Sequence, residues 1–379
     1  MKILKIEQRG PPAIGGVEKN VLETSKIFSK LGYETEIWSS DIMTHEKDVD
    51  NRISFMYEGL KIRKFKSHNV HLPFLKLIYS SFIKSLRNLK DSKNIVIHTH
   101  SFLFHTIAVL INAKRFKKVI VTLHLDTTNP PKKILMKVLK MFTSQENVYI
   151  TGDTENEKQF FIKNGFNPNK VFVVPNGVNL KDFENITKNE IKDLKEEYNI
   201  TNSSNVLFVG RLTKIKGCDL LIKAIPLLKS KNVKIIFAGP DFGSRDEWKE
   251  LALKLNVYDK IIFTGKLSQK KLSTLYNACD VLVHSSYGGE SFGITLVEAM
   301  ACKKPVIGSR TGGVKELIED GKNGLKFDIG DYKQLAENIN ILLENNSIRR
   351  KMGNYGYKLV KKKYTWNIVA RKYLNIMNQ

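Results

Sequence analysis

Cysteine is scarce in this chain of 379 residues, which contains only Cys218, Cys279 and Cys302. Three cysteines in apolar surroundings, without the spacing of a metal site, provide neither a disulfide framework nor a zinc centre. We therefore expect buried free thiols in a reducing compartment. Small disulfide-stabilised secreted domains are excluded on this ground.

Long apolar runs are missing too. No uncharged apolar stretch approaches the roughly 18 residues of a membrane span. The first residues lead directly into a predicted strand, so we expect no signal peptide and a cytoplasmic protein. The hydrophobic content of 42% is that of a globular protein, and 379 residues suffice for two domains.

Acidic residues are few relative to basic ones. The chain has 62 Lys and Arg against 38 Asp and Glu, a net charge of +24. Between Lys61 and Lys90 there are eight basic residues and no acid, and between Lys114 and Lys140 the only acid is Asp126. Such a balance indicates an anionic partner, which could be nucleic acid, an anionic membrane face or a phosphorylated substrate.

Apolar, β-prone runs alternate with amphipathic helical patterns, such as 17–31 and 155–164, in two successive sets. The first set of predicted strands is 2–6, 35–39, 95–100, 119–125, 148–151 and 171–174, with a hairpin arm at 57–66. The second set is 206–210, 234–238, 261–264, 281–284 and 305–307. Strands that are apolar on both faces form parallel sheets covered by helices. We therefore predict an α/β protein of two doubly wound, Rossmann-like domains facing each other across a cleft, with ligands at the carboxyl ends of the strands.

The polar stretch 179–204 separates the two sets and is expected to hold a linker and one helix. We place the first domain at residues 1–183 and the second at 184–363.

Glycine-containing turns follow the first strand of each set. Gly15 and Gly16 come just before a helix, and Gly210 precedes Arg211 and Lys216 at a strand-to-helix turn. A guanidinium grips a diphosphate as a fork and an ammonium adds a point charge, while helix-start amides add partial positive charge. Neither turn fits a dinucleotide or P-loop pattern. The alternative for Arg211 is an ion pair between domains.

Glu290 and Glu298 lie in a segment with the pattern strand, tight turn, helix, strand. The helix is expected at 292–301, and a separation of eight residues is a little over two turns, which places both carboxylates near the same face. A helix start approached through glycines binds anions, and carboxylates suit the hydroxyls of a sugar and a ribose. The alternative is that Glu298 solvates the helix and Glu290 ends a loop.

Several short motifs occur in one order along nearly the whole chain. They are Gly15-Gly16-Val17-Glu18, Val174-Pro175-Asn176-Gly177-Val178, Gly210-Arg211 with Lys216-Gly217, Ala238-Gly239-Pro240, Glu290-Ser291-Phe292-Gly293 with Glu298-Ala299-Met300, Lys304-Pro305-Val306-Ile307, Gly312-Gly313 and Asn323-Gly324. Together they resemble glycosyltransferase family 4, whose members are retaining enzymes of the GT-B fold.

The resemblance implies a role for each matching position. Arg211 and Lys216 would hold the donor diphosphate of a UDP- or GDP-linked sugar. Glu298 would bind the ribose hydroxyls and Glu290 the hydroxyls of the transferred sugar. The family needs no divalent metal and no other cofactor, because basic side chains and helix dipoles stabilise the departing nucleotide diphosphate, which is the electrostatic logic expected for developing charge.

Further positions follow from the same resemblance. Ser291, Phe292 and Gly293 would complete the donor site through their backbone amides, and Gly15 and Gly16 would let the backbone approach the donor from the other domain. The final helix, 364–379, would return to the first domain with an apolar stripe of Trp366, Val369, Tyr373 and Ile376.

Histidines end two of the predicted strands. His124 occupies the position where the family carries a histidine beside the reacting sugar, and its alternative is a bond to a loop carbonyl. His100 is a candidate for the acceptor side, while His98, which we take to alternate with it along the strand, is less favoured. Asp153 and Glu157 are expected to be solvated residues at a helix start.

The reaction implied by the resemblance is transfer of a hexosyl group with retention at the anomeric carbon, through an oxocarbenium-like transition state. The sequence shows no carboxylate nucleophile of the kind that retaining glycosidases use. The departing phosphate would help to deprotonate the acceptor, so Glu290 is assigned to positioning.

The segment from residue 71 to 90 bears on the acceptor. Apolar residues recur there at helical spacing among basic ones, and two interpretations stay open. The segment is either a helix lying on an anionic membrane surface or a core-packed helix with solvated lysines. The first would make the acceptor a lipid-linked glycan or glycolipid of the cell envelope and the enzyme peripheral on the inner face of the plasma membrane.

Other functions remain as alternatives. A nucleotide-sugar 2-epimerase on the same fold would need its own acid–base set, and a phosphorylase would carry a pyridoxal lysine in a much longer chain. A basic nucleic-acid-binding protein is suggested by the net charge alone, without a module signature or aromatic–basic interleaving.

Overall fold

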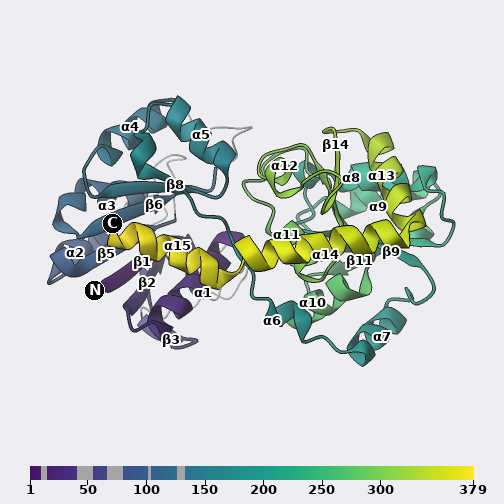
Figure 1. Ribbon diagram of the computed structural model, residues 1–379, viewed down its shortest axis with the longest axis horizontal. Coiled ribbons are helices and arrows are strands. Elements are labelled where there is room, and N and C mark those ends of the chain that lie inside the picture. The colour runs from purple at the N-terminus through teal and green to yellow at the C-terminus, as the bar shows by residue number, and fades with distance from the viewer. Residues whose placement is uncertain (10–14, 41–53, 66–79, 101–103, 126–132) are drawn as a thin grey trace. The chain divides into compact units, whose positions relative to one another are not determined.

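The computed structural model describes residues 1–9, 15–40, 54–65, 80–100, 104–125 and 133–379 (Figure 1). The chain forms two compact units, each of which is considered by itself. The first comprises Met1–Leu125, Pro130–Asn176 and Trp366–Gln379, and the second comprises Gly177–Thr365. Within the described residues, no helix is both long and apolar enough to cross a bilayer.

The first unit contains one sheet in the order β3-β4-β2-β1-β5-β6-β7-β8. Its strands are β1 (Lys2–Arg9), β2 (Glu34–Ser40), β3 (Ser54–Tyr57), β4 (Leu60–Phe65), β5 (Ile95–Thr99), β6 (Lys118–Thr122), β7 (Val148–Gly152) and β8 (Val171–Val173). All neighbours are parallel except β3 and β4, which form the antiparallel hairpin predicted near residue 57.

Helices cover this sheet, as runs of Val and Ile buried on both strand faces require. They are α1 (Gly16–Lys30), α2 (Ser80–Arg87), α3 (Phe104–Ile111), α4 (Lys133–Thr143), α5 (Glu155–Lys163) and α15 (Trp366–Asn378). The C-terminal helix α15 lies beside α1 in Figure 1. Its predicted apolar stripe of Trp366, Val369, Tyr373 and Ile376 is buried.

The second unit is a fully parallel sheet in the order β11-β10-β9-β12-β13-β14. Its strands are β9 (Ser204–Val209), β10 (Val233–Ala238), β11 (Ile261–Gly265), β12 (Val281–His284), β13 (Val306–Ser309) and β14 (Gly324–Phe327). The last strand was not predicted, because four residues with a glycine carry little strand signal.

The helices of the second unit are α6 (Lys181–Glu184), α7 (Lys188–Glu197), α8 (Cys218–Ala224), α9 (Arg245–Lys254), α10 (Gln269–Ala278), α11 (Ile294–Ala301), α12 (Val314–Leu317), α13 (Tyr332–Glu344) and α14 (Asn346–Lys363). Separate apolar clusters fill the two faces of the sheet. All three cysteines are buried and free, as predicted.

The stretch 179–204 is not a linker with one helix. It contains both α6 and α7, and its Phe183, Leu194 and Ile200 are buried in the core of the second unit. This is why the chain divides at Asn176, a few residues before the boundary drawn from the sequence.

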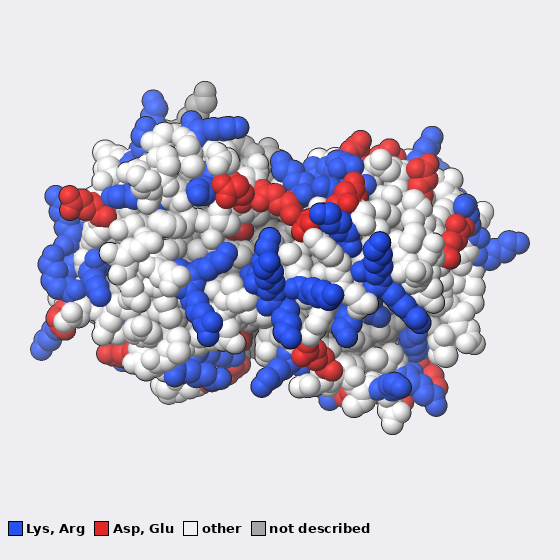
Figure 2. All heavy atoms as spheres, in the orientation of Figure 1, with Lys and Arg blue, Asp and Glu red and all other residues white. Residues whose placement is uncertain are grey.

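The basic excess is visible on the surfaces of both units. Figure 2 shows Lys and Arg side chains outnumbering acidic ones on each unit, with acidic groups interspersed among them. The charge on this face is therefore distributed and is not gathered into a single stripe.

Candidate functional site

The strand order of the second unit creates a topological switch point. Strand β9 pairs with β10 on one side and with β12 on the other. The connections that leave β9 and β12 run to opposite sides, and open α/β sheets bind their ligands at such a point, at the carboxyl ends of the two strands. The loop after β9 carries Arg211 and Lys216, and the loop after β12 carries Glu290.

Glu290 is the centre of a polar cluster at this switch point. Its Oε2 accepts hydrogen bonds from Lys216 Nζ at 2.7 Å and from the His284 ring at 3.0 Å, and its Oε1 accepts one from the backbone N–H of Gly293 at 2.9 Å. Burial raises the pKa of this carboxyl, but the His284 and Lys216 contacts outweigh it and hold the pKa well below its usual range. Glu290 is therefore an ionised group with both oxygens engaged.

Backbone contacts fix the Lys216 loop against the loop that follows β12. The N–H of Tyr287 donates to the carbonyl of Ile215 at 2.8 Å, and the hydroxyl of Ser285 donates to the carbonyl of Lys216 at 3.2 Å. Gly217 has a φ of 66°, and a Cβ at this position would lie 2.0 Å from the carbonyl oxygen of Ser285. Glycine is required there for both reasons.

The glycine pair Gly312-Gly313 packs against the Glu290 loop. A Cβ at Gly312 would lie 1.9 Å from the carbonyl oxygen of Glu290, and one at Gly313 would lie 2.2 Å from that of Ser291. The N–H of Gly313 donates to the Glu290 carbonyl at 3.1 Å. The predicted Gly312-Gly313 motif therefore lets one backbone pass directly against another.

Arg211 is exposed, and its guanidinium lies over the Phe242 ring with 5.7 Å to the ring centroid. Among the described residues it makes no ion pair. Its charge is therefore held in place by an aromatic face and remains available to an external anion.

Glu298 lies on α11 and is only 5% exposed, so it does not solvate the helix. Its Oε2 accepts a hydrogen bond from the hydroxyl of the fully buried Tyr276 at 2.8 Å. Helical spacing does not align Glu298 with Glu290, contrary to our prediction. Gly293 has a φ of 92° and α11 begins only at Ile294, so Glu290 precedes the helix.

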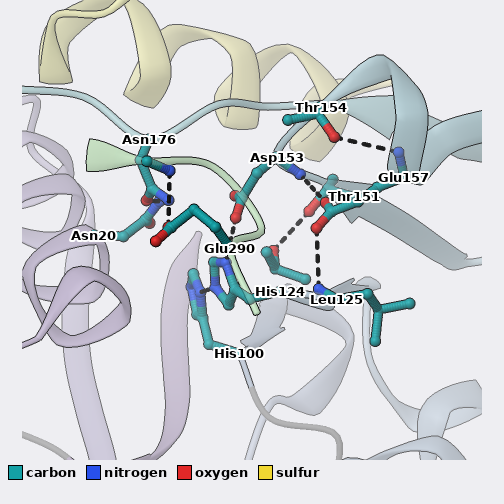
Figure 3. A network of polar contacts seen from close by, with 12 residues as sticks. Asn20, His100, His124, Leu125, Thr151, Asp153, Thr154, Glu157, Asn176 and Glu290 are labelled. Atoms are coloured by element: carbon teal, nitrogen blue, oxygen red, sulfur yellow. Dashed lines mark hydrogen bonds and ion pairs between the residues drawn. The ribbon is translucent and has the colours of Figure 1, made fainter. Parts of the chain in front are cut away.

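In the first unit, the predicted histidines come together with an aspartate. His124 Nδ1 lies 2.7 Å from Asp153 Oδ2, and His124 Nε2 lies 3.5 Å from His100 Nδ1 (Figure 3). His100 follows β5, His124 follows β6 and Asp153 follows β7. Because parallel strands end at one edge of a sheet, three separate loops bring these side chains together. The partner of His124 is a carboxylate and not the loop carbonyl considered above.

His98 shares a face with His100, contrary to our assignment. Residues two apart on a strand point the same way, and the two ring centroids are 4.0 Å apart. His98 Nε2 lies 2.7 Å from the hydroxyl of Thr122, away from the His124–Asp153 pair. Burial lowers the pKa of both His98 and His100 well below the ordinary range, and the charge of Lys5 adds to the shift.

Asp153 and Glu157 are not solvated, as each is 1% exposed. The Glu157 carboxylate accepts hydrogen bonds from the backbone N–H groups of Leu125 and Asp153 (Figure 3). Burial, and then the Asp153 charge, raise the pKa of Glu157 well above its usual value. Glu157 thereby joins the two chain segments that carry His124 and Asp153.

Gly15 and Gly16 begin α1 in the first unit. A Cβ at Gly15 would lie 2.2 Å from Oε2 of Glu18, whereas a Cβ at Gly16 would meet nothing within 4 Å. Gly15 thus leaves room for the Glu18 carboxylate at the helix start. On the same helix, the Asn20 amide donates to the Asn176 side-chain oxygen at 2.7 Å (Figure 3), which connects α1 with the predicted motif at 174–178.

Lys5, Tyr276 and His284 were not identified from the sequence as members of these clusters. Asp153 was named, but its contact with His124 was not predicted. For His284 a signal was present, since it ends a predicted strand just before Glu290. Lys5 interrupts an apolar strand, which is unusual for a lysine. Tyr276 and Asp153 carried no local signal.

The comparison with known families agrees with this geometry. The model of the family described as Glycosyltransferase Family 4 matches residues 14–182, and that described as Glycosyl transferases group 1 matches residues 190–359. The chain belongs to glycosyltransferase family 4. The protein is therefore an enzyme, and the match gives no support to the nucleic-acid-binding alternative.

Relatives of this glycosyltransferase extend over its whole length. It is 26% identical to an uncharacterised glycosyltransferase of Methanocaldococcus jannaschii over 97% of this chain and 96% of the relative. It is 22% identical to D-inositol 3-phosphate glycosyltransferase of Corynebacterium diphtheriae over 97% and 90%. The crystal structure of Anabaena HepE in complex with UDP superposes with a TM-score of 0.83 at 21% identity, covering 100% of both chains. That likeness shows that this glycosyltransferase has the GT-B fold.

Proposed function

We propose that this glycosyltransferase moves a hexosyl group from a nucleotide diphosphate sugar to a hydroxyl acceptor with retention at the anomeric carbon. The observation that carries the proposal is the cluster at the switch point of the second unit. There Lys216 and the Gly293 N–H donate to an ionised Glu290, and the same loop that carries Lys216 also carries the exposed Arg211. HepE, which has the same fold, was crystallised with UDP.

The donor is held by charge and by hydroxyl contacts in this proposal. Arg211 and Lys216 bind the diphosphate and neutralise it as the glycosidic bond breaks, without a divalent metal. Glu298 binds the ribose hydroxyls and Glu290 those of the transferred sugar. The amides of Ser291, Phe292 and Gly293 complete the donor site of the second unit, and Gly15 and Gly16 of the first unit are proposed to contact the donor through their backbone.

The contacts of Glu290 favour positioning over nucleophilic attack. Both of its oxygens accept hydrogen bonds, and Lys216 and His284 share one of them. A carboxylate stabilised in this way is a weak nucleophile, because attack would require it to give up these contacts. In the proposed reaction the departing phosphate receives the acceptor proton, and His124 with His100 lies on the acceptor side.

The acceptor is proposed to be a lipid-linked glycan or a glycolipid at an anionic membrane surface. Lys84, Arg87 and Lys90 are exposed, which supports electrostatic contact with such a surface. Phe82 and Leu86, however, are buried in the core of the first unit, so they do not insert into lipid. The remainder of the predicted helix, residues 71–79, lies outside the described residues.

A vesicle flotation assay tests the membrane step. The protein should float with vesicles that contain an anionic lipid and remain unbound to neutral ones, and the difference should shrink in high salt. Reversing Lys84, Arg87 and Lys90 to Glu should abolish flotation while leaving the fold intact, since all three are exposed. Equal recovery with both vesicle types would contradict the membrane part of the proposal.

Substitution of the two proposed diphosphate ligands tests the donor site. Arg211→Ala and Lys216→Ala should each lower kcat/KM by about 100-fold or more, because each removes charge that stabilises the leaving group. Lys214→Ala is a matched control from the same loop, since Lys214 is 75% exposed and pairs with Glu247. Near-wild-type rates for either ligand variant would refute its assignment.

The reaction itself is tested by the anomeric configuration of the product and by whether the donor sugar is transferred or epimerised. A panel of UDP- and GDP-sugars in a thermal-shift assay identifies the donor, since a ligand bound to the folded state raises the melting temperature. NMR of the product should then show the same anomeric configuration as the donor. If the donor alone yields an epimerised nucleotide sugar, the enzyme is a 2-epimerase and the transfer proposal fails.

A further inference from the structure

Lys5 is a completely buried lysine in the central strand β1 of the first unit. Its Nζ lies 2.6 Å from Thr24 Oγ1 and 3.3 Å from His100 Nε2. The rings of Phe28 and Tyr373 enclose it, with centroids at 5.4 and 5.2 Å. Fully buried lysines are rare because desolvation disfavours their charge. The partners of a completely buried lysine must therefore compensate for the loss of its hydration.

The contact with Thr24 establishes that Lys5 donates. The hydroxyl of Thr24 already donates its hydrogen to the carbonyl oxygen of Asn20. Thr24 Oγ1 therefore accepts from Lys5. Burial lowers the pKa of Lys5 well below its ordinary value. As an ammonium or as an amine, Lys5 retains a further N–H that it can donate toward His100 Nε2 at 3.3 Å.

The other end of the same chain of contacts accepts. Carboxylate oxygens accept hydrogen bonds, so we place the hydrogen of the 2.7 Å contact on Nδ1 of His124, which donates it to Asp153 Oδ2. A neutral imidazole has one N–H, so His124 Nε2 is left as an acceptor. His100, with Nε2 accepting from Lys5, has its hydrogen on Nδ1, which faces His124 Nε2 at 3.5 Å.

With Lys5 donating at one end and Asp153 accepting at the other, neutral His100 and His124 can form all three contacts only if each carries its hydrogen on Nδ1. We propose that Lys5 is a positioning residue that donates to His100 Nε2 and so fixes His100 as the Nδ1–H tautomer, with this N–H facing Nε2 of His124, which Asp153 keeps as a hydrogen-bond acceptor for a substrate hydroxyl. The long contact between His100 and His124 is one that such a hydroxyl can replace. The role of the hydroxyl rests on the proposed function, whereas the tautomers do not.

Nitrogen NMR of the full-length protein without substrate tests the tautomers directly. Labelling with ¹⁵N-histidine and recording long-range ¹H–¹⁵N correlations at neutral pH distinguishes protonated from unprotonated ring nitrogens. The expected result is Nδ1 protonated and Nε2 unprotonated for both His100 and His124. Protonation of His100 or His124 on Nε2 in the wild-type protein overturns the proposal, and this result requires no variant.

Lys5→Met tests the cause, because it keeps the length of the side chain and removes its donors. His100 should then lose its single tautomer and show protonation on Nε2, whereas His124 should stay protonated on Nδ1 because Asp153 still accepts from it. Lys118→Met is the matched control, since Lys118 is a second buried lysine of the same sheet that donates instead to the carbonyl of Ile376 at 2.7 Å. An unchanged His100 tautomer in folded Lys5→Met protein overturns the proposal.

Kinetics separate this role from a structural one. Lys5→Met should lower kcat by about 10-fold or more with little change in KM for the donor, because the His100–His124 pair loses its fixed arrangement beside the acceptor hydroxyl in the transition state. An equal kcat in Lys5→Met and wild type overturns the substrate part of the proposal. If the tautomers are as expected but no sugar is transferred, the proposed function fails and the positioning by Lys5 stands.

Discussion

At the scale of single residues, Glu290 illustrates how partners set a chemical role. Two cationic or hydrogen-bonding side chains and one backbone N–H engage its carboxylate. They keep it ionised and directed, which suits a group that orients sugar hydroxyls. The same carboxylate on an exposed loop would have neither the fixed direction nor the depressed pKa. His284 is therefore as much a part of this site as Lys216.

Gly313 offers a residue-scale test of the loop geometry. Gly313→Ala should destabilise the protein by about 1–3 kcal/mol, because its Cβ would overlap the Ser291 carbonyl oxygen, and it should weaken nucleotide binding by displacing the Glu290 loop. Urea unfolding and nucleotide titration measure the two effects.

The control for this substitution is Gly210→Ala. A Cβ at Gly210 would lie 3.5 Å from the Phe208 ring, an ordinary contact. If both alanine variants unfold at the same urea concentration, the close approach at Gly313 does not support the loop.

At the scale of elements, both clusters depend on where parallel strands end. Lys216 and Glu290 come from the loops after β9 and β12, the two strands at the switch point. His100, His124 and Asp153 come from the loops after β5, β6 and β7. In each unit the sheet is a rigid base, and chemistry-bearing side chains are gathered at its carboxyl edge.

Helix packing in the first unit leads to a pH prediction. His105 on α3 packs edge-on against Phe82 on α2, with ring centroids 4.8 Å apart, and burial lowers the pKa of His105 to about 4. An unfolded histidine has a pKa of about 6.5. Between these values the unfolded state binds more protons, so the free energy of unfolding should rise with pH and level off above the unfolded pKa.

His105→Phe should remove part of this slope. The wild-type protein should lose up to about 3 kcal/mol between neutral pH and pH ~4 through His105 alone. Urea unfolding of both proteins across this range measures how the free energy of unfolding of each depends on pH. The other buried histidines are present in both proteins, so their contributions cancel in the comparison. A variant with the wild-type slope would show that His105 is not held neutral by its surroundings.

At the scale of the whole molecule, the first unit is built from both ends of the chain. Residues 1–125 and 130–176 are completed by Trp366–Gln379, which follows the entire second unit. In α15, Tyr373 is fully buried and the carbonyl of Ile376 accepts from Lys118 at 2.7 Å. The first unit therefore cannot finish folding until the last helix has been synthesised.

A truncation after Thr365 tests this dependence. Losing the buried stripe of α15 should cost several kcal/mol, at about 1.5–3 kcal/mol for each large apolar side chain. That is comparable with the ~5–15 kcal/mol stability of a domain. Calorimetry should show a lost or lowered transition for the first unit, while the transition of the second unit should remain. Removing only the exposed Asn378 and Gln379 is the control. If the truncation after Thr365 leaves the transition of the first unit unchanged, the prediction is contradicted.

The sequence by itself determined the two parallel-sheet units, most strands, the hairpin and the loops that carry Arg211, Lys216 and Glu290. These follow from local signals, since apolar runs set strands and glycines mark turns within a few residues. Only the tertiary structure decided the Lys5–His100–His124–Asp153 contacts, the burial of Glu157 and the packing of Phe82 and Leu86. Those contacts join residues on four strands or strand ends far apart in the chain. No local pattern records them, because which side chains meet depends on the order in which the strands assemble.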